Sequence, residues 1–235
     1  MHFHELFRER VNRTRKVHMS NLLDIYQRLF EHYGTRNWWP AETPFEVVVG
    51  AILTQNTNWN NVEKAIVNLR QADALTIDAI LNLDLETLEQ LIRPSGYFHQ
   101  KAERLQLFCR YLHEHHQGSL ERLFDQELNL VRDELLRLKG IGPETADSML
   151  LYAGNRPSFV VDAYTNRLFG RLGLLTGKEK YAFVRDLFMS LLPEDIHLYN
   201  EYHALIVIHC KDFCRKKPLC QHCPCADICL EKQQN

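Results

Sequence analysis

The 235-residue sequence lacks the features of several specialised protein classes. It has no apolar run long enough to cross a bilayer and no apolar leader of the secretory type, so we expect a cytoplasmic protein without a membrane partner. An excess of positive charge is also absent, because 28 Lys and Arg residues are offset by 30 Asp and Glu. A formal net charge of -2 argues against a chain that coats nucleic acid by bulk electrostatics and leaves room for a local basic surface.

Internal repeats, low-complexity tracts and long linkers are missing as well. The β-branched run at residues 45–53 by itself suggests a strand, but no alternating partner strands follow, so a buried helix is favoured. A basic segment at residues 8–16 leads into a helix that ends near Gly34, and further helical patterns cover 61–117 with breaks at 72–76 and 93–97, then 126–138, 163–172, 179–191 and 196–209. The sequence therefore predicts an all-α fold.

Cysteine is concentrated rather than scarce. Five of the seven cysteines lie between Cys214 and Cys229, which in a cytosolic chain indicates a metal site rather than disulfides. Four thiolates at such short spacings can hold a 4Fe-4S cluster or a tetrahedral zinc, and the spacing alone does not separate them. The basic residues 215–217 form a loop that suits phosphate contact, whereas Cys109 and Cys210 are better interpreted as buried structural residues.

A glycine-rich turn follows the predicted helix at residues 126–138. Two glycines permit a sharp turn that brings backbone N–H groups close to a phosphate, and Pro143 stands where a second helix would begin. Such contacts hold a DNA backbone without reading its sequence, although an ordinary tight turn is the alternative. The residues expected to contact the backbone are Lys139, Gly140, Ile141, Gly142 and Thr145.

An aspartate, Asp162, comes about twenty residues after this turn and directly follows the buried apolar residues 159–161. Its carboxylate is expected at the start of the next helix, directed at whatever the hairpin holds. The alternative is that Asp162 only caps that helix near Asn166 and Arg167, and for the aspartate taken alone the cap is favoured.

Together, the hairpin and the aspartate resemble the helix-hairpin-helix glycosylase superfamily, in particular its endonuclease III branch. The resemblance covers nearly the whole chain, since residues 50–57 look like the family's DNA-probing loop and 96–105 like its middle helices. It implies a monomer that binds duplex DNA containing a damaged base, associates with the nucleoid and uses Asp162 as the catalytic acid residue. It also implies two lobes, with a six-helix barrel domain over 41–155, its helix-hairpin-helix at 126–154, and a second domain formed by 1–40 and 156–235.

The same resemblance implies a 4Fe-4S cluster in a loop over residues 214–229. Its preferred ligands are Cys214, Cys220, Cys223 and Cys229, which are separated by five, two and five residues. The family's common spacing is six, two and five, so this chain is one residue short in the first interval. Cys225 is therefore an alternative ligand.

Glu144 is the most informative departure from the family pattern. In endonuclease III proteins that also cut the strand, this position holds a lysine whose amine forms a Schiff base with the sugar. A carboxylate cannot form the imine, so the chain resembles the monofunctional members, which use water as the nucleophile. Glu144 is a candidate to assist catalysis, against the stronger alternative of a first-turn residue favoured by the helix dipole.

Aromatic and amide residues supply the candidate base pocket and DNA probe: Trp38, Trp39, Gln55, Asn56 and Trp59. For Trp39 and Trp59, a place in the hydrophobic core is the alternative. Gln55 and Asn56 are placed to enter the gap that a flipped base leaves, with turn hydrogen bonding as the alternative. The motifs at 38–40, 53–57 and 93–97 look like those of 3-methyladenine glycosylases, although that branch commonly lacks the cysteine cluster. Indole faces attract the positive charge of alkylated purines, whose glycosidic bond is already weak.

The leading prediction is therefore a monofunctional alkylpurine DNA glycosylase. One alternative is an endonuclease III-like glycosylase and AP lyase for oxidised pyrimidines, which Glu144 disfavours. The other is a non-catalytic DNA-binding iron–sulfur module, which has no need for a carboxylate at Asp162.

Overall fold

The structure, a computed structural model, describes residues 21–36 and 38–233. Every regular element within these ranges is a helix, which confirms the all-α prediction. The basic segment at residues 8–16 lies outside the described residues. Among the described helices, none is both long and apolar enough to cross a membrane.

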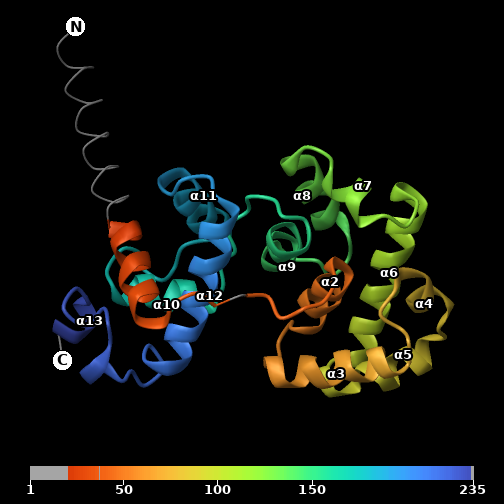
Figure 1. Cartoon of the computed structure of the whole chain (residues 1–235), viewed down its shortest axis with the longest axis horizontal. Helices are drawn as coiled ribbons and strands as arrows, with labels where there is room; N and C mark the ends of the chain where they lie inside the picture. The colour runs from red at the N-terminus through yellow and green to blue at the C-terminus, as the bar shows by residue number, and fades with distance from the viewer. Residues whose placement is uncertain (1–20, 37, 234–235) are drawn as a thin grey trace, which may run out of the picture. The chain divides into compact units, whose positions relative to one another are not determined.

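The chain forms two compact units (Figure 1). One, which we call the hairpin unit, is Trp39–Ser158; the other, the terminal unit, combines Met1–Trp38 with Phe159–Asn235. The six-helix barrel and the domain limits at residues 41 and 155 stay predictions, and each unit is described by itself.

Eight α-helices and two short helical turns make up the hairpin unit. They are α2 (Pro44–Leu53), α3 (Trp59–Gln71), α4 (Ile77–Asn82), α5 (Leu85–Ile92), the 3-10 turn η1 (Arg93–Ser95), α6 (Phe98–His116), α7 (Leu120–Phe124), α8 (Leu128–Arg137), α9 (Pro143–Ser148) and the π-helical turn η2 (Met149–Ala153). α2 is buried from Phe45 to Leu53 and packs against α3, α6, α9 and η2. The β-branched run is thus a buried central helix, as the absence of partner strands predicted.

Two details of this unit differ from the sequence prediction. The helical pattern at residues 61–117 is also broken at Leu83 and Asp84, and α7 was not expected. Both follow from local caps, because Asp84 accepts a hydrogen bond from the Thr87 N–H at 2.8 Å and Ser119 accepts one from the Arg122 N–H at 3.2 Å. Such N-caps start new helices where hydrophobic periodicity shows no interruption.

The helix-hairpin-helix is α8, the turn at 138–142 and α9. Pro143 occupies the first turn of α9, as predicted. Its two helices are joined by a buried ion pair in which Arg132 donates to Asp147 through Nε at 2.8 Å and Nη2 at 3.0 Å. Ser158 Oγ donates to the same carboxylate at 2.5 Å, and Asp147 is fully buried.

We expect Asp147→Ala to lower the free energy of unfolding by about 3 kcal/mol, because it leaves the Arg132 guanidinium without its buried partner. The matched control is Glu42→Ala, which removes an ion pair with Arg70 in the same unit from a side chain that is 73% exposed. Exposed pairs contribute about 1 kcal/mol or less, so the control should be nearly neutral in urea denaturation. Equal losses for the two variants would contradict the assignment.

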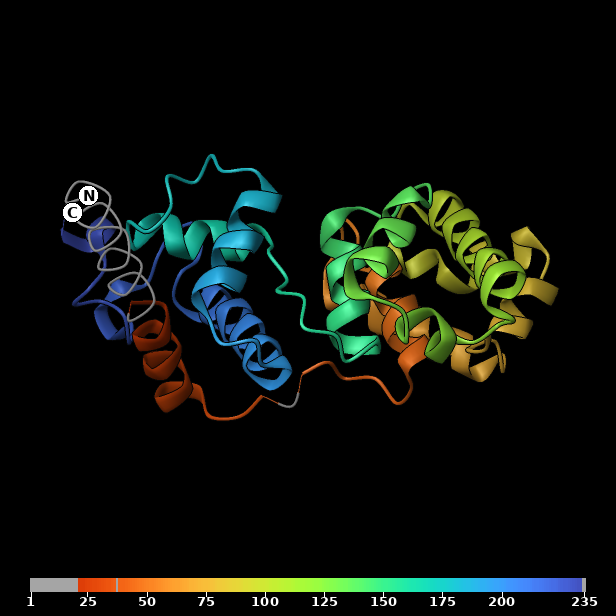
Figure 2. The ribbon, with the colours of Figure 1, turned by 90° about the horizontal axis from the view of Figure 1, so that it is seen from above.

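The terminal unit contains a helix over residues 21–33, α10 (Ala163–Arg171), α11 (Tyr181–Leu191), α12 (Ile196–Asp212), the 3-10 turn η3 (Cys220–His222) and α13 (Leu230–Gln233). Its core is aromatic, with Phe159 and Phe169 both packed against Phe188. The helix at 21–33 lies beside α12 (Figure 2), where the Tyr202 hydroxyl donates to the Leu22 carbonyl at 2.7 Å. Arg28 of that helix also pairs with Asp227 in the cysteine-rich loop, so the helix at 21–33 contacts this loop as well as α12.

Candidate functional site

The hairpin turn exposes some of its predicted contacts and buries others. Lys139 and Glu144 are exposed, whereas Ile141 and Thr145 are buried. Gly140 has a φ of +89°, which requires glycine, and Gly142 begins α9 without a side-chain cap. Glycine supplies no side-chain oxygen to cap α9, which suits a turn that receives a phosphate.

Asp162 caps α10, and its two carboxylate oxygens have different surroundings. Oδ1 accepts hydrogen bonds from Thr165 N–H at 2.8 Å and from Thr165 Oγ1 at 3.0 Å. The cap is therefore present, made by Thr165 rather than by Asn166 or Arg167. Oδ2 lies 3.6 Å from His203 Nε2, within ion-pair distance when that ring is protonated.

The Asp162 carboxyl is ionised at neutral pH. Burial acts to raise its pKa, but His203 and the two donors of Thr165 outweigh burial, and the pKa is held below its ordinary value. The side chain is 12% exposed, so this fixed negative charge remains accessible. Sequence reasoning missed His203, although a histidine inside the apolar stretch of α12 is a signal for a buried polar contact.

The predicted pocket residues lie in different surroundings. Trp39 and Trp59 meet edge to face with ring centroids 5.1 Å apart, and Trp39 also contacts Tyr152 at 5.1 Å. This aromatic cluster packs on the core beside Gly50, where a Cβ would lie 3.3 Å from the Trp39 ring. Trp38 belongs to the terminal unit, where the Lys211 ammonium lies 6.0 Å from its ring centroid.

Gln55 and Asn56 follow α2 but differ sharply. Gln55 is half-buried and makes three side-chain hydrogen bonds to Arg104 and to the hairpin residues Gly140 and Thr145. Asn56 is exposed and has a φ of +54°. The two residues therefore do not share one role.

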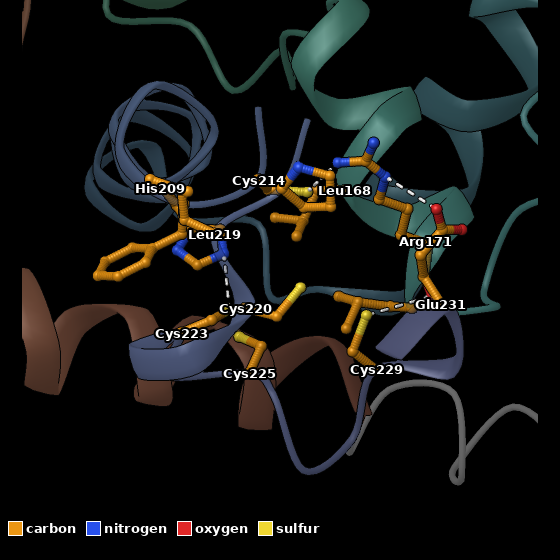
Figure 3. A pocket seen from close by; sticks show the side chains of 13 residues that line it. Leu168, Arg171, His209, Cys214, Leu219, Cys220, Cys223, Cys225, Cys229 and Glu231 are labelled. Atoms are coloured by element: carbon orange, nitrogen blue, oxygen red, sulfur yellow. Dashed lines mark hydrogen bonds and ion pairs between the residues drawn. The ribbon is translucent and has the colours of Figure 1, made fainter. Parts of the chain in front are cut away.

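The cysteines of the C-terminal loop surround one cavity (Figure 3). It is lined by Cys214, Cys220, Cys223, Cys225 and Cys229. Arg171 at the end of α10 donates to Cys214 Sγ at 3.3 Å, and His209 Nε2 lies 3.6 Å from Cys223 Sγ. A cavity bordered by five thiols suits a group that thiolates hold.

The five thiols differ in their surroundings. A hydrogen bond from Cys210, with help from Arg171 and against the effect of burial, lowers the pKa of Cys214 to about 6. Burial raises the pKa of Cys225 to about 12. In the described part of the chain, no three His, Cys, Asp or Glu side chains are arranged to hold a metal ion.

Comparison with known proteins places these features in one family. The model of the HhH-GPD superfamily of base excision DNA repair proteins matches residues 49–194, a span that contains the hairpin and Asp162. MJ1434 of Methanocaldococcus jannaschii, named as a candidate DNA repair glycosylase, is 53% identical over 88% of this chain and 95% of its own length. Endonuclease III of Synechocystis is 30% identical over 94% and 95% of the two chains.

A solved structure adds a third similarity. The Helicobacter pylori 3-methyladenine DNA glycosylase bound to 1,N6-ethenoadenine superimposes with a TM-score of 0.69 and 28% identity. The match covers 84% of this chain and 97% of that one.

Proposed function

This chain belongs to the HhH-GPD superfamily of base excision DNA repair proteins, and we propose that it is a monofunctional DNA glycosylase that hydrolytically removes alkylated purines such as 3-methyladenine. The observation that carries the monofunctional part is Glu144, exposed in the first turn of α9. Strand-cutting members that this hairpin resembles place a lysine amine at that position. A carboxylate cannot replace that amine in imine chemistry, so water is the nucleophile.

The substrate class is supported by similarity and by the aromatic cluster. The H. pylori relative is named for 3-methyladenine and was solved with a modified adenine. Here, Trp39, Trp59 and Tyr152 pack together beside α2. Indole and phenol faces attract a cationic purine more strongly than a neutral one, and such a base needs little protonation to leave.

Asp162 is proposed as the catalytic residue. As the bond between C1′ and the purine nitrogen breaks, its electron pair leaves with the base and C1′ becomes cationic. Water then forms the new bond to C1′ and loses a proton to solvent or to the Asp162 carboxylate. Because Oδ1 is fixed by Thr165, the ionised carboxylate needs no reorganisation to stabilise the developing charge.

We also propose that the C-terminal loop holds a 4Fe-4S cluster through Cys214, Cys220, Cys223 and Cys229. Ligands of one zinc ion converge on one point, whereas cluster ligands bind separate irons and stand further apart around a cavity. The five thiols line one cavity, and no three of them among the described residues converge on a single-ion site, which fits the second arrangement. When bound, the cluster would hold the loop together. We also propose that the protein acts in the cytoplasm on nucleoid DNA, because free thiols at this density suit a reducing compartment.

A second candidate is a glycosylase and AP lyase for oxidised pyrimidines. The 30% identity to an endonuclease III across nearly the whole chain favours it, and Lys139 supplies a hairpin amine. A non-catalytic DNA-binding module is less favoured, because such a module gains nothing from an accessible ionised carboxylate at Asp162.

A panel of single-lesion duplexes tests the proposal. Purified protein should release 3-methyladenine or 7-methylguanine in single-turnover reactions and leave thymine glycol in place. Release of oxidised pyrimidines in preference to alkylated purines would establish the second candidate, and duplex binding without release of any base would establish the third.

Borohydride trapping tests the monofunctional assignment. We expect no covalent protein–DNA adduct and strand breaks only after alkali or heat, because no amine stands at position 144. Glu144→Lys is the matched gain-of-function variant, and it should trap weakly because a lysine there also needs a lowered pKa. Efficient trapping by the unmodified protein that disappears in Lys139→Ala would make the protein a lyase that uses the hairpin amine.

A further inference from the structure

A histidine of α12 reaches the start of α10. His203 lies in the buried stretch of α12 from Tyr202 to Val207 and is only 6% exposed. α10 and α12 pack against each other (Figure 1), and this packing brings His203 Nε2 to 3.6 Å from Oδ2 of Asp162. The ring nitrogen is itself buried, so a hydrogen that it carries needs an acceptor inside the fold. The Asp162 carboxylate supplies one.

The two carboxylate oxygens of Asp162 are held by different elements. Oδ1 accepts hydrogen bonds from the N–H and Oγ1 of Thr165, at 2.8 and 3.0 Å, within α10 itself. Oδ2 faces His203 of α12. Contacts at one oxygen leave the plane of a carboxylate free to tilt about that oxygen, whereas contacts at both oxygens define the plane. His203 therefore fixes the orientation of Oδ2, the oxygen that Thr165 leaves available.

The position of His203 is itself fixed by contacts on both sides of it along α12. Just before it, Tyr202 packs edge to face on Phe159, with ring centroids 6.0 Å apart, so α12 also holds the segment that leads into the aspartate. Two turns after it, the Cys210 carbonyl accepts a hydrogen bond at 3.2 Å from Arg167 Nη2 of α10. The separation of the imidazole from the carboxylate is thus set by the packing of the two helices.

The contact between His203 and Asp162 suits a hydrogen bond that tightens when substrate binds. Its 3.6 Å exceeds the upper limit of about 3.2 Å for a normal N–H···O bond. Catalytic hydrogen bonds are often long in a free enzyme and shorten in the substrate complex, and here a closing movement of about 0.5 Å is enough. A carboxylate oxygen at this place selects the ring forms that carry a hydrogen on Nε2. The imidazole is therefore the donor.

We propose that His203 is a positioning residue for base release, whose Nε2–H orients Oδ2 of Asp162 toward the C1′ atom that becomes cationic. The inference rests on the proposed DNA glycosylase function and on Asp162 as its catalytic residue. In this role His203 touches neither the base nor the sugar and acts only through the carboxylate. What it supplies is a directed N–H group, so an uncharged donor that reaches the same point should replace it.

The test uses variants that differ in the reach of the donor. Glutamine places its amide nitrogen as many bonds from Cα as Nε2 of histidine, whereas the amide nitrogen of asparagine is one bond closer. His203→Gln should therefore release an alkylated base within about threefold of the wild-type rate, while His203→Asn and His203→Leu should be about 10- to 100-fold slower in single-turnover reactions. His197→Leu changes an exposed histidine of the same helix and should match the wild type.

Two further measurements separate positioning from a structural role. Urea unfolding and binding to undamaged duplex should be alike for His203→Gln and His203→Asn, so that their difference in base release does not come from the fold. His203→Leu should also add little to the loss in an Asp162→Asn background, because His203 acts through that carboxylate.

Three results would overturn the inference and leave the proposed function standing: normal base release by His203→Leu, equal losses in His203→Gln and His203→Asn, or a full additional loss on adding His203→Leu to Asp162→Asn. A wild-type protein that releases no base from any lesion duplex would overturn the proposed function, and the inference with it.

Discussion

Asp162→Asn is expected to slow base release about 10²- to 10³-fold, the loss typical when a fixed electrostatic partner is removed from a transition state. Asparagine keeps an oxygen that can accept from the Thr165 N–H, so α10 retains its cap and the fold should persist. Only the negative charge is lost. Single-turnover excision on an alkylated duplex measures the rate, and gel-shift titration should show unchanged DNA affinity.

Asp195→Asn is the matched control for this variant. Asp195 caps α12 in the same unit and accepts hydrogen bonds from the N–H groups of His197, at 2.8 Å, and Leu198, at 3.1 Å. It repeats the change of a capping carboxylate to an amide without touching Asp162. Excision should be normal in this control, and comparable excision by the two variants would reduce Asp162 to a structural cap.

The pH dependence of stability follows from the same carboxylate. Because its folded-state pKa is lowered, ionised Asp162 stabilises the fold at pH above the ordinary value of 3.8. This contribution is lost as the pH falls through the lowered pKa of the folded state. The free-energy difference between wild type and Asp162→Asn should therefore shrink as the pH falls into strong acid.

Local backbone chemistry explains why much of the fold could be predicted. The break before α4, the start of α9 at Pro143 and the turn at Gly140 all follow from residues whose φ or hydrogen bonding is restricted. Hydrophobic periodicity alone did not show the interruption at Leu83 and Asp84, because the cap of α5 depends on a side-chain hydrogen bond. Short helices that depend on a side-chain cap, such as α7, were thus harder to predict than long helices with a clear hydrophobic period.

Long-range contacts explain what the sequence could not show. Gln55 forms hydrogen bonds with three residues that lie 49, 85 and 90 positions away in the sequence. No feature of the sequence near Gln55 identifies these partners. By contrast, the sequence does indicate that Lys101 has buried hydrogen-bond partners. It shares the buried face of α6 with Leu105 and Phe108, and a lysine at a buried helical position must find acceptors inside the fold.

Some features of the candidate site depend on residue type alone. A carboxylate at position 144 cannot itself form an imine whatever the fold, and the clustered cysteines predict a metal from composition alone. The partner of Asp162 could not be predicted, because His203 reaches it from α12 across 41 positions of sequence. Identifying such partners requires the packing of α10 on α12.

Cys220→Ser is expected to yield a colourless or poorly soluble protein that has lost most of its iron. A serine in place of the thiolate leaves one iron without its protein ligand, and the loop over residues 214–229 then loses the group that would hold it together. The loop's own contacts include those of Arg171, which donates to the carbonyls of Arg215 and Lys216, and the pair of Arg28 with Asp227. Iron content and visible absorbance measure the loss without any assay of base release.

Cys225→Ser is the matched control, because Cys225 lines the same cavity and is 1% exposed. Cys225 stands outside the four cysteines whose spacing resembles the family's pattern, which suits a packing role rather than iron binding. Cys225→Ser should therefore keep its iron and its brown colour. If Cys220→Ser kept all of its iron and Cys225→Ser lost it, Cys225 would be the ligand and Cys220 the packing residue. A colourless wild-type protein that contains zinc would show that the loop holds a single zinc ion instead of a cluster.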